Sequence, residues 1–155
     1  MDVSGKEILV FQDGSIYQGQ TQDNQPHGTG VWSSIDGEVY EGEWKWGKRH
    51  GKGKCTWADG ESYSGDWDQD EKQGQGQYIF SNGDQYVGQY VKSSIAGPGM
   101  MLFKDGMKYV GQWKQNQPQG EGVLTDKDGV RYKQVWKNGK CTSEDVQDVR
   151  KLRKK

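Results

Sequence analysis

Large apolar residues are scarce in this chain of 155 residues. Only 30% of the residues are hydrophobic, well below the ~45–50% of ordinary soluble domains, and this composition excludes a thick core. No apolar run approaches the ~20 residues that a membrane-spanning helix needs. The formal net charge is only −1, so the chain lacks an overall basic field that would attract nucleic acid or an anionic membrane.

Cysteine is also rare, which argues against a disulfide framework. The two cysteines, Cys55 and Cys141, show no regular spacing and are expected to be free thiols, as in a reducing compartment. The beginning of the chain shows no signal-peptide pattern. Together these features predict a cytoplasmic protein.

Aromatic residues and glycine, by contrast, are abundant and recur at a fixed interval. Seven Trp, eight Tyr and three Phe argue against a disordered chain. A tyrosine falls every 23 residues, at Tyr17, Tyr40, Tyr63, Tyr86, Tyr109 and Tyr132. A glycine precedes each tyrosine by three residues, and a glycine pair follows all but the last by eleven and thirteen residues. A fixed period without insertions indicates one supersecondary unit that is repeated in space.

Each unit predicts a β-hairpin. Side chains over residues 39–44 alternate with period two, with the aromatic residues and glycine on one side. Every unit also contains Asp-Gly or Asn-Gly, the strongest short hairpin signal. A three-residue loop at 58–60 pairs Trp57 with Glu61 and keeps all rings and glycines on one face, whereas a two-residue turn separates them. We therefore expect a strand, a three-residue loop, a second strand and then a connection of about six residues.

The predicted fold class is all-β. Repeated hairpins give an elongated single-layer antiparallel meander of about twelve strands, and a layer of this length should twist and curve into a trough. The array is expected to cover residues 5–140 as about six repeats. Its first and last repeats are incomplete, because Thr21 stands where an aromatic residue is expected and Gln134 where a glycine is expected.

A short helix is expected to close the array within residues 141–155. Ser143 is a suitable N-cap, acidic residues follow it and basic residues come last. Val146, Val149 and Leu152 would share one face of this helix. Its expected role is to cover the edge of the last strand, since an open edge invites aggregation.

The unit Tyr-x-Gly-x-Trp, followed by Gly-x-Gly and Asp-Gly, resembles the MORN (membrane occupation and recognition nexus) repeat. Residues 57–67 and 48–53 are close matches, and the likeness covers nearly the whole chain. MORN arrays occur as scaffolds in cilia, cytoskeletons and membrane junctions. The resemblance implies a partner segment lying in an aromatic groove, and in some members phosphoinositide contact. It favours a small subunit of a larger cytoskeletal or ciliary assembly.

Enzymatic activity is not expected, and neither is a metal or cofactor. His27 and His50 share a repeat position and should lie ~9–10 Å apart, too far for one zinc ion. Glu38, Glu61 and Asp84 form an acidic ladder with a spacing near that of inverting glycosidases, ~6.5–9.5 Å. A repeat produces such spacing without any chemistry, so the ladder is interpreted as solvated turn residues.

The face that carries the rings is the expected binding site. A single-layer sheet has no second layer to bury this face, and Trp and Tyr dominate interaction hot spots. One interpretation is that the rings pack only on one another and on the glycines. The favoured one is that they also grip a helical or extended segment of a partner protein. The predicted groove comprises Tyr40, Trp44, Trp57, Tyr63, Trp67, Phe80, Tyr86, Tyr90, Phe103, Tyr109 and Trp113. On this basis Trp67→Ala should weaken partner binding by ~2 kcal/mol or more and leave the sheet folded.

Binding to an anionic, phosphoinositide-containing membrane is the alternative function. The basic residues at the C-terminal end are Arg150, Lys151, Arg153, Lys154 and Lys155. Each cation near a charged leaflet contributes ~1 kcal/mol. Nucleic acid is not an expected partner, because Glu41, Glu43, Asp66 and Asp68 add negative charge to the strands. The sequence leaves open a homodimer in which two arrays bury their troughs against each other.

Overall fold

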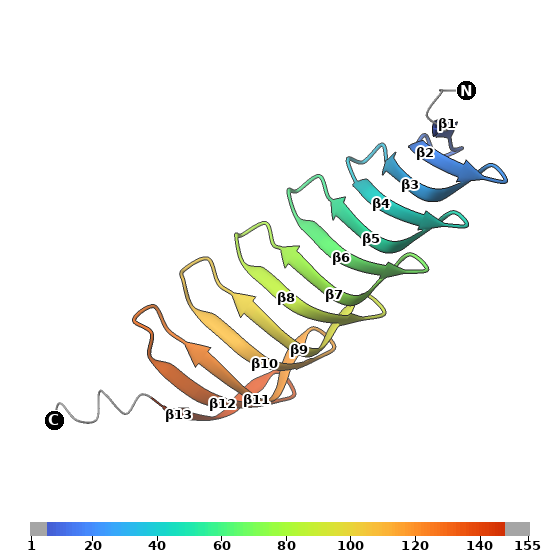
Figure 1. Ribbon diagram of the computed structural model, residues 1–155. Coiled ribbons are helices and arrows are strands. Elements are labelled where there is room, and N and C mark those ends of the chain that lie inside the picture. The colour runs from blue at the N-terminus through green and yellow to red at the C-terminus, as the bar shows by residue number, and fades with distance from the viewer. Residues whose placement is uncertain (1–5, 148–155) are drawn as a thin grey trace.

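The computed structural model describes residues 6–147, which form one antiparallel sheet of 13 strands in sequential order (Figure 1). The strands are β1 (Lys6–Val10), β2 (Ile16–Gln22), β3 (Gln25–Ser33), β4 (Val39–Lys45), β5 (Lys48–Thr56), β6 (Ser62–Asp68), β7 (Glu71–Ile79), β8 (Gln85–Val91), β9 (Ser94–Leu102), β10 (Lys108–Lys114), β11 (Gln117–Thr125), β12 (Arg131–Lys137) and β13 (Lys140–Val146). The predicted all-β meander is confirmed, with one strand more than the expected twelve.

The predicted C-terminal helix is wrong where the structure describes it. Residues 143–146 belong to β13, in which Ser143 lies opposite Val135 and Asp145 opposite Lys133. Another strand satisfies the open N–H and C=O groups of β12 directly, which a helix laid over the edge would not do. The remainder of the predicted helix, from 148 onward, lies outside the described residues.

The three-residue Asp-Gly loops are confirmed. The Trp57 amide donates to the Glu61 carbonyl at 2.9 Å, and the Gly60 amide donates to the Trp57 carbonyl at 3.0 Å. Gly60 has a φ of 89°, a conformation that glycine adopts at little cost. Gly53 pairs with Gly65, so the glycines share one face as the register argument requires.

The predicted six-residue connections are wrong. Each is a two-residue turn in which both residues have positive φ, as at Trp46 (49°) and Gly47 (79°). Such a turn matches the right-handed twist of the flanking strands. The strands therefore continue through residues that the sequence assigned to loops.

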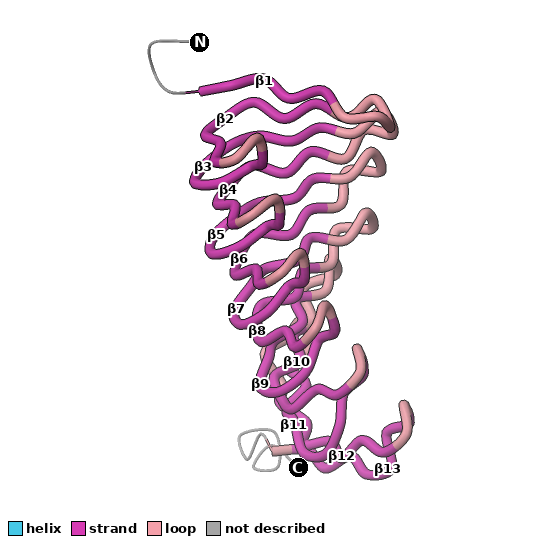
Figure 2. The backbone as a smooth tube through the Cα atoms, turned by 90° about the vertical axis from the view of Figure 1, so that its right-hand side faces the viewer, coloured by secondary structure: helices cyan, strands magenta, loops and turns pink. Residues whose placement is uncertain are grey.

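Every second pair of neighbouring strands contains a β-bulge close to its two-residue turn. Gly42 lies opposite Gly53, whereas Trp44, two residues later, lies opposite Arg49. The extra residues of β5 include Gly51, whose φ is 65°. Bulges bend the strand that carries them, and Figure 2 shows the ends of the hairpins at the two-residue turns folding back over the sheet.

The core is a single row of rings seated on glycines. A Cβ atom on Gly53 would lie 2.1 Å from the Tyr40 hydroxyl oxygen, so the Tyr40 ring lies directly on bare backbone. The Tyr40 hydroxyl donates to the Glu43 carbonyl at 2.8 Å, and the Trp67 indole N–H donates to the Gly53 carbonyl at 3.1 Å. Backbone carbonyls thus hold both rings, and the indoles of Trp44, Trp67 and Trp113 each connect two successive repeats in this way.

One core tyrosine lacks its hydrogen bond. The Tyr63 hydroxyl donates to the Asp66 carbonyl at 2.7 Å, whereas the buried Tyr109 hydroxyl has no partner among the described residues. We expect Tyr63→Phe to cost ~1 kcal/mol of unfolding free energy, and Tyr109→Phe to be neutral or stabilising, because an unpaired buried hydroxyl is itself unfavourable. Urea denaturation of the two variants beside wild type measures this. An equal loss of unfolding free energy in the two variants would contradict the absence of a hydrogen bond at the Tyr109 hydroxyl.

The two outermost strands carry polar residues where inner strands carry glycine. Glu7 pairs with Gly19 in β2, at the position of Gly30 and Gly53 in later repeats. In β13 Glu144 lies opposite Gln134, as Gly122 lies opposite Gly111 one repeat earlier. The Tyr132 hydroxyl donates instead to the Asp126 carboxylate at 3.3 Å. The regular seating of rings on glycines therefore stops at both ends of the described sheet.

Candidate functional site

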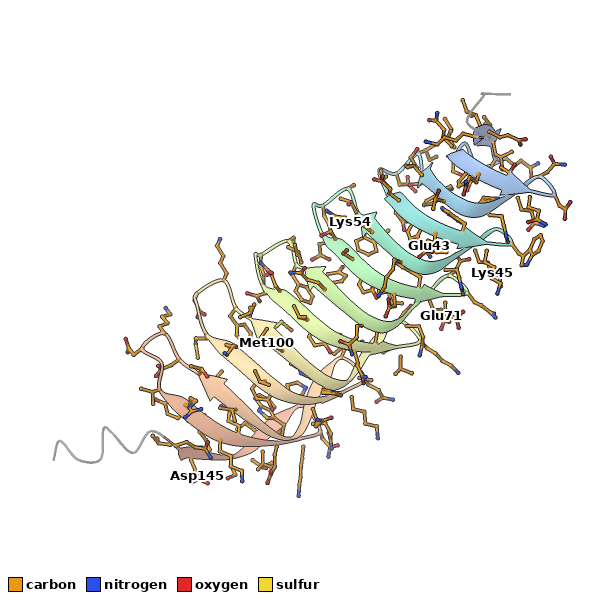
Figure 3. The ribbon with its side chains drawn as sticks, in the orientation of Figure 1. Glu43, Lys45, Lys54, Glu71, Met100 and Asp145 are labelled. Atoms are coloured by element: carbon orange, nitrogen blue, oxygen red, sulfur yellow. The ribbon has the colours of Figure 1, made fainter. Side chains whose placement is uncertain are left out.

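The face that carries the rings forms a trough between the Asp-Gly loops and the two-residue turns. At its N-terminal end lies a hollow of about 450 Å³. Phe11 and Ser15 line it from the first loop, Pro26 from the side of the first two-residue turn, and Trp32 and Trp44 from the strands. Residues from both rows of turns therefore border the same space. The many side chains that project from the sheet are visible in Figure 3.

The eleven predicted groove residues separate into a floor and a rim. Eight are buried, namely Tyr40, Trp44, Tyr63, Trp67, Tyr86, Tyr90, Tyr109 and Trp113. The other three, Trp57, Phe80 and Phe103, directly precede three-residue loops that end in Asp-Gly or Asn-Gly, and they are half-buried or exposed. We call these three the rim residues. The floor residues hold the repeats together, so the rim residues are the predicted ring-face positions that are open to a partner.

Arg49 lies inside the trough, a position that sequence reasoning missed. Its guanidinium carbon is 4.4 Å from the centre of the Trp67 ring, a cation–π distance. Its nitrogens lie 3.5 Å from a Glu38 carboxylate oxygen and 3.2 Å from an Asp70 carboxylate oxygen. The sequence assigned Arg49 to a loop because the two-residue turn went unrecognised.

Lys72 occupies a cage of four aromatic rings. Its ammonium nitrogen lies 5.3 Å from the centre of the Trp57 ring, 5.5 Å from that of Tyr63, 4.9 Å from that of Tyr78 and 5.6 Å from that of Tyr90. Burial among these rings lowers the pKa of Lys72. The faces of aromatic rings attract cations, so the trough provides a cation site and fills it with its own side chain.

The acidic residues of the predicted ladder have structural partners. Glu61 accepts hydrogen bonds from the Tyr78 hydroxyl at 2.7 Å and from the Ser81 amide at 2.8 Å, and these bonds lower the pKa of Glu61. The Cys55 thiol donates to Glu38 at 3.2 Å. Burial raises the pKa of Cys55 to about 12, which makes it a poor nucleophile.

The side chains that line the trough differ between its two halves. Charged side chains gather between β4 and β8, namely Glu38, Arg49, Glu61, Asp70, Lys72 and Asp84. The half from β9 to β11 is lined by Ile95, Met101, Phe103, Met107 and Leu124. A bound segment would therefore meet charges at one end and apolar side chains at the other.

The remaining candidate groups do not form a second site. The His27 ring accepts a hydrogen bond from the Trp46 amide, and His50 lies beside Asp68. Within residues 6–147 no group of three or more His, Cys, Asp or Glu side chains could hold a metal ion. No helix in that range is long and apolar enough to cross a membrane. The basic residues 150–155 lie outside the described part of the chain.

Comparison with known families decides the identity of the repeat. Five consecutive segments match the MORN repeat, at residues 17–39, 40–62, 63–85, 86–108 and 109–131. The chain belongs to the MORN-repeat family. Each matched MORN segment begins at a core tyrosine, and the recognised pattern therefore coincides with the buried row of rings.

A solved structure is similar in fold to this MORN array. The TCP domain of SAS-4 (dCPAP) of Drosophila Melanogaster, in complex with a proline-rich motif of Ana2 (dSTIL), gives a TM-score of 0.59 at 13% identity, covering 94% of this chain and 85% of that one. The TCP10 domain of Danio rerio CPAP, in complex with a peptide of STIL, gives 0.40 at 16% identity, covering 90% and 68%. The SAS-4 match establishes likeness of fold. No curated protein matches the sequence.

Proposed function

We propose that this MORN array is a non-catalytic scaffold that binds a segment of a partner protein in its trough. The observation that carries the proposal is the continuous ring face, which no second layer covers in the described chain and whose rim residues stay accessible. Exposed aromatic surface of this kind usually marks an interaction site. The SAS-4 TCP domain, which has a similar fold, is described in complex with a proline-rich motif. Proline-rich segments are extended, so this supports an extended peptide as the ligand here.

The distribution of side chains constrains the partner segment. Over β9–β11 it should present apolar residues, since the trough there is apolar. Over β4–β8 it should present polar or basic residues, because the carboxylates of Glu38, Glu61, Asp70 and Asp84 outnumber the cations Arg49 and Lys72 there. The proposed setting is a cytoplasmic assembly associated with the cytoskeleton or a cilium, in which this chain is one subunit.

Substitution of the rim residues tests the proposal. We expect Trp57→Ala, Phe80→Ala and Phe103→Ala together to weaken partner binding by ~2 kcal/mol or more, because truncated aromatic anchors cost this much in protein interfaces. The measurement is affinity capture of the tagged protein from its native cells, compared by quantitative mass spectrometry between wild type and variant. Titration of the purified partner then gives the change in affinity.

A matched control lies on the opposite face of the sheet. Ile79 and Val87 are each 37% exposed, as Phe103 is, and Val110 is 45% exposed. Truncation of these three to alanine removes apolar surface from the other face and should leave capture unchanged. Equal loss in both triple variants, or no loss in the rim variant, would contradict binding in the trough. Light scattering of the purified chain separately reports whether two copies occupy each other's troughs.

A further inference from the structure

One position in the repeat determines what lies above the row of rings. It is the second residue of each odd-numbered strand from β3 to β11. Pro26, Arg49, Lys72, Ile95 and Pro118 occupy it in turn. Arg49 and Lys72 place cations against the rings, and Ile95 is a buried apolar filler. Pro26 cannot reach as far as either cation, because its side chain is a short closed ring.

The four rings around Lys72 have aromatic counterparts in the first repeat. The same repeat positions lie 46 residues earlier in the sequence. They hold Phe11 in place of Trp57, Tyr17 in place of Tyr63, Trp32 in place of Tyr78 and Trp44 in place of Tyr90. The other repeats do not keep this set. Around Arg49, two of the four ring positions hold Ser34 and Cys55. Around Ile95 one of them holds Met101, and around Pro118 one holds Leu124. Only the first and third repeats of the described array thus combine four aromatic residues at these positions.

In the first repeat this ring set borders open space. Phe11, Pro26, Trp32 and Trp44 line the hollow of about 450 Å³ at the N-terminal end of the trough, which we call the first hollow. The Tyr17 ring lies beneath, with its centre 5.3 Å from that of Trp44. The third repeat fills the corresponding space with the Lys72 side chain. The first hollow has the same kind of walls without an internal occupant, since Pro26 is too short to supply one.

The charges around the first hollow also favour a cation. Asp13, Glu38 and Asp70 line it together with one basic residue, Arg49. Arg49 is paired with both Glu38 and Asp70, and Asp13 accepts hydrogen bonds from Ser15. Three carboxylates around the hollow are therefore balanced by one guanidinium. Opposite charges at such short range stabilise a bound cation, and the partly enclosed site screens them less than bulk water does.

We propose that the first hollow binds an alkylammonium group, supplied by a lysine or methylated lysine side chain of a partner protein. Lys72 in its own ring cage is the internal example of this recognition, and aromatic cages are suited to ammonium groups that carry methyl substituents. Only the source of the ammonium group, a partner protein, depends on the proposed scaffold function. The site itself is testable without a partner.

The first test uses small ions and the intact chain. Choline is titrated into the purified protein, and the indole N–H signals of the tryptophans are followed by proton–nitrogen correlation NMR. We expect saturable shifts of the Trp32 and Trp44 signals, with little change at Trp113 and Trp136 in the distant repeats. Dimethylbutanol, the neutral isostere of choline, should bind at least about tenfold more weakly, since the cation–π contribution of a partly desolvated site is lost. Equal binding of both, or no saturable shift with choline, would overturn the proposal.

Two variants exchange the occupancy of the two cages. Pro26→Lys supplies the first hollow with an internal ammonium and should abolish the choline shifts of Trp32 and Trp44. Lys72→Ala empties the third-repeat cage and should add a second choline site, reported by the Trp57 signal. Unchanged choline binding in Pro26→Lys would overturn the proposal even if Lys72→Ala fails to fold. If choline binds as expected but the rim variants capture partners normally, the proposed function fails and the cation site stands.

Discussion

Gly53→Ala is expected to destabilise the array by about 3 kcal/mol or more, near the upper end of the cost of overpacking a core. The added Cβ would lie 2.1 Å from the hydroxyl oxygen and 2.4 Å from the Cζ atom of Tyr40. The Tyr40 ring is completely buried, so it has no free direction in which to move. Its hydroxyl would also lose the bond to the Glu43 carbonyl. The substitution therefore disrupts the packing between β4 and β5, the two strands of one repeat.

A glycine of the same repeat provides the control. Gly60 has a φ of 89°, and a Cβ there would meet nothing within 4 Å. Gly60→Ala should lower the unfolding free energy by only ~1–2 kcal/mol, the cost of placing a residue with a Cβ in the left-handed conformation. Urea denaturation followed by circular dichroism compares the midpoints of the two variants with that of wild type. A midpoint for Gly53→Ala at or above that of Gly60→Ala would show that the contact between ring and glycine does not stabilise the hairpin.

The second large effect is expected for Trp67→Ala, at ~3–5 kcal/mol of unfolding free energy. The Trp67 ring is only 4% exposed, and its N–H donates to the Gly53 carbonyl at 3.1 Å. It also lies edge-on to Tyr40 and Tyr63 and carries the Arg49 guanidinium. Truncation to alanine removes all of these contacts and leaves a cavity between repeats.

This burial changes the expectation drawn from the sequence, in which Trp67→Ala weakens partner binding and leaves the sheet folded. Loss of binding in that variant would now be accompanied by loss of structure. Trp57→Ala is the appropriate comparison, because Trp57 is a half-buried rim residue. We expect Trp57→Ala to retain a denaturation midpoint closer to wild type than Trp67→Ala does. The reverse order would place Trp57, rather than Trp67, in the structural core.

The glycine pattern was sufficient to predict the register of the sheet. Parity alone selected the three-residue loop, because only that loop places Gly53 opposite Gly65. The two-residue turns gave no such signal. Gln69 and Asp70, for instance, have φ values of 45° and 68°, although neither is glycine. Tertiary contacts hold this turn, since the Asp70 amide donates to the Arg49 carbonyl at 3.1 Å. Contacts between repeats are not visible in the residues of one turn.

The site was predicted in part for the same reason. Alternation placed the rings on one face, but it could not tell Trp57 on the rim from Trp67 in the floor. That distinction arises from the bulges, which fold the hairpin ends back over the sheet (Figure 2). The same fold carries Arg49 and Lys72 into the trough. Without the bulge these side chains belong to a solvent-exposed connection, which is where the sequence placed them.

The polar residues on the two outermost strands oppose the addition of further hairpins to the sheet. A further strand of the Tyr-x-Gly-x-Trp type placed against β1 would set its ring on Glu7 instead of on bare backbone. At the other end, Glu144 lies opposite Gln134, at the position where a glycine lies in the inner hairpins. Growth of the sheet by another copy of the same hairpin is therefore blocked at both edges. Two carboxylates thus oppose the end-to-end joining of two such arrays, which would lengthen the trough.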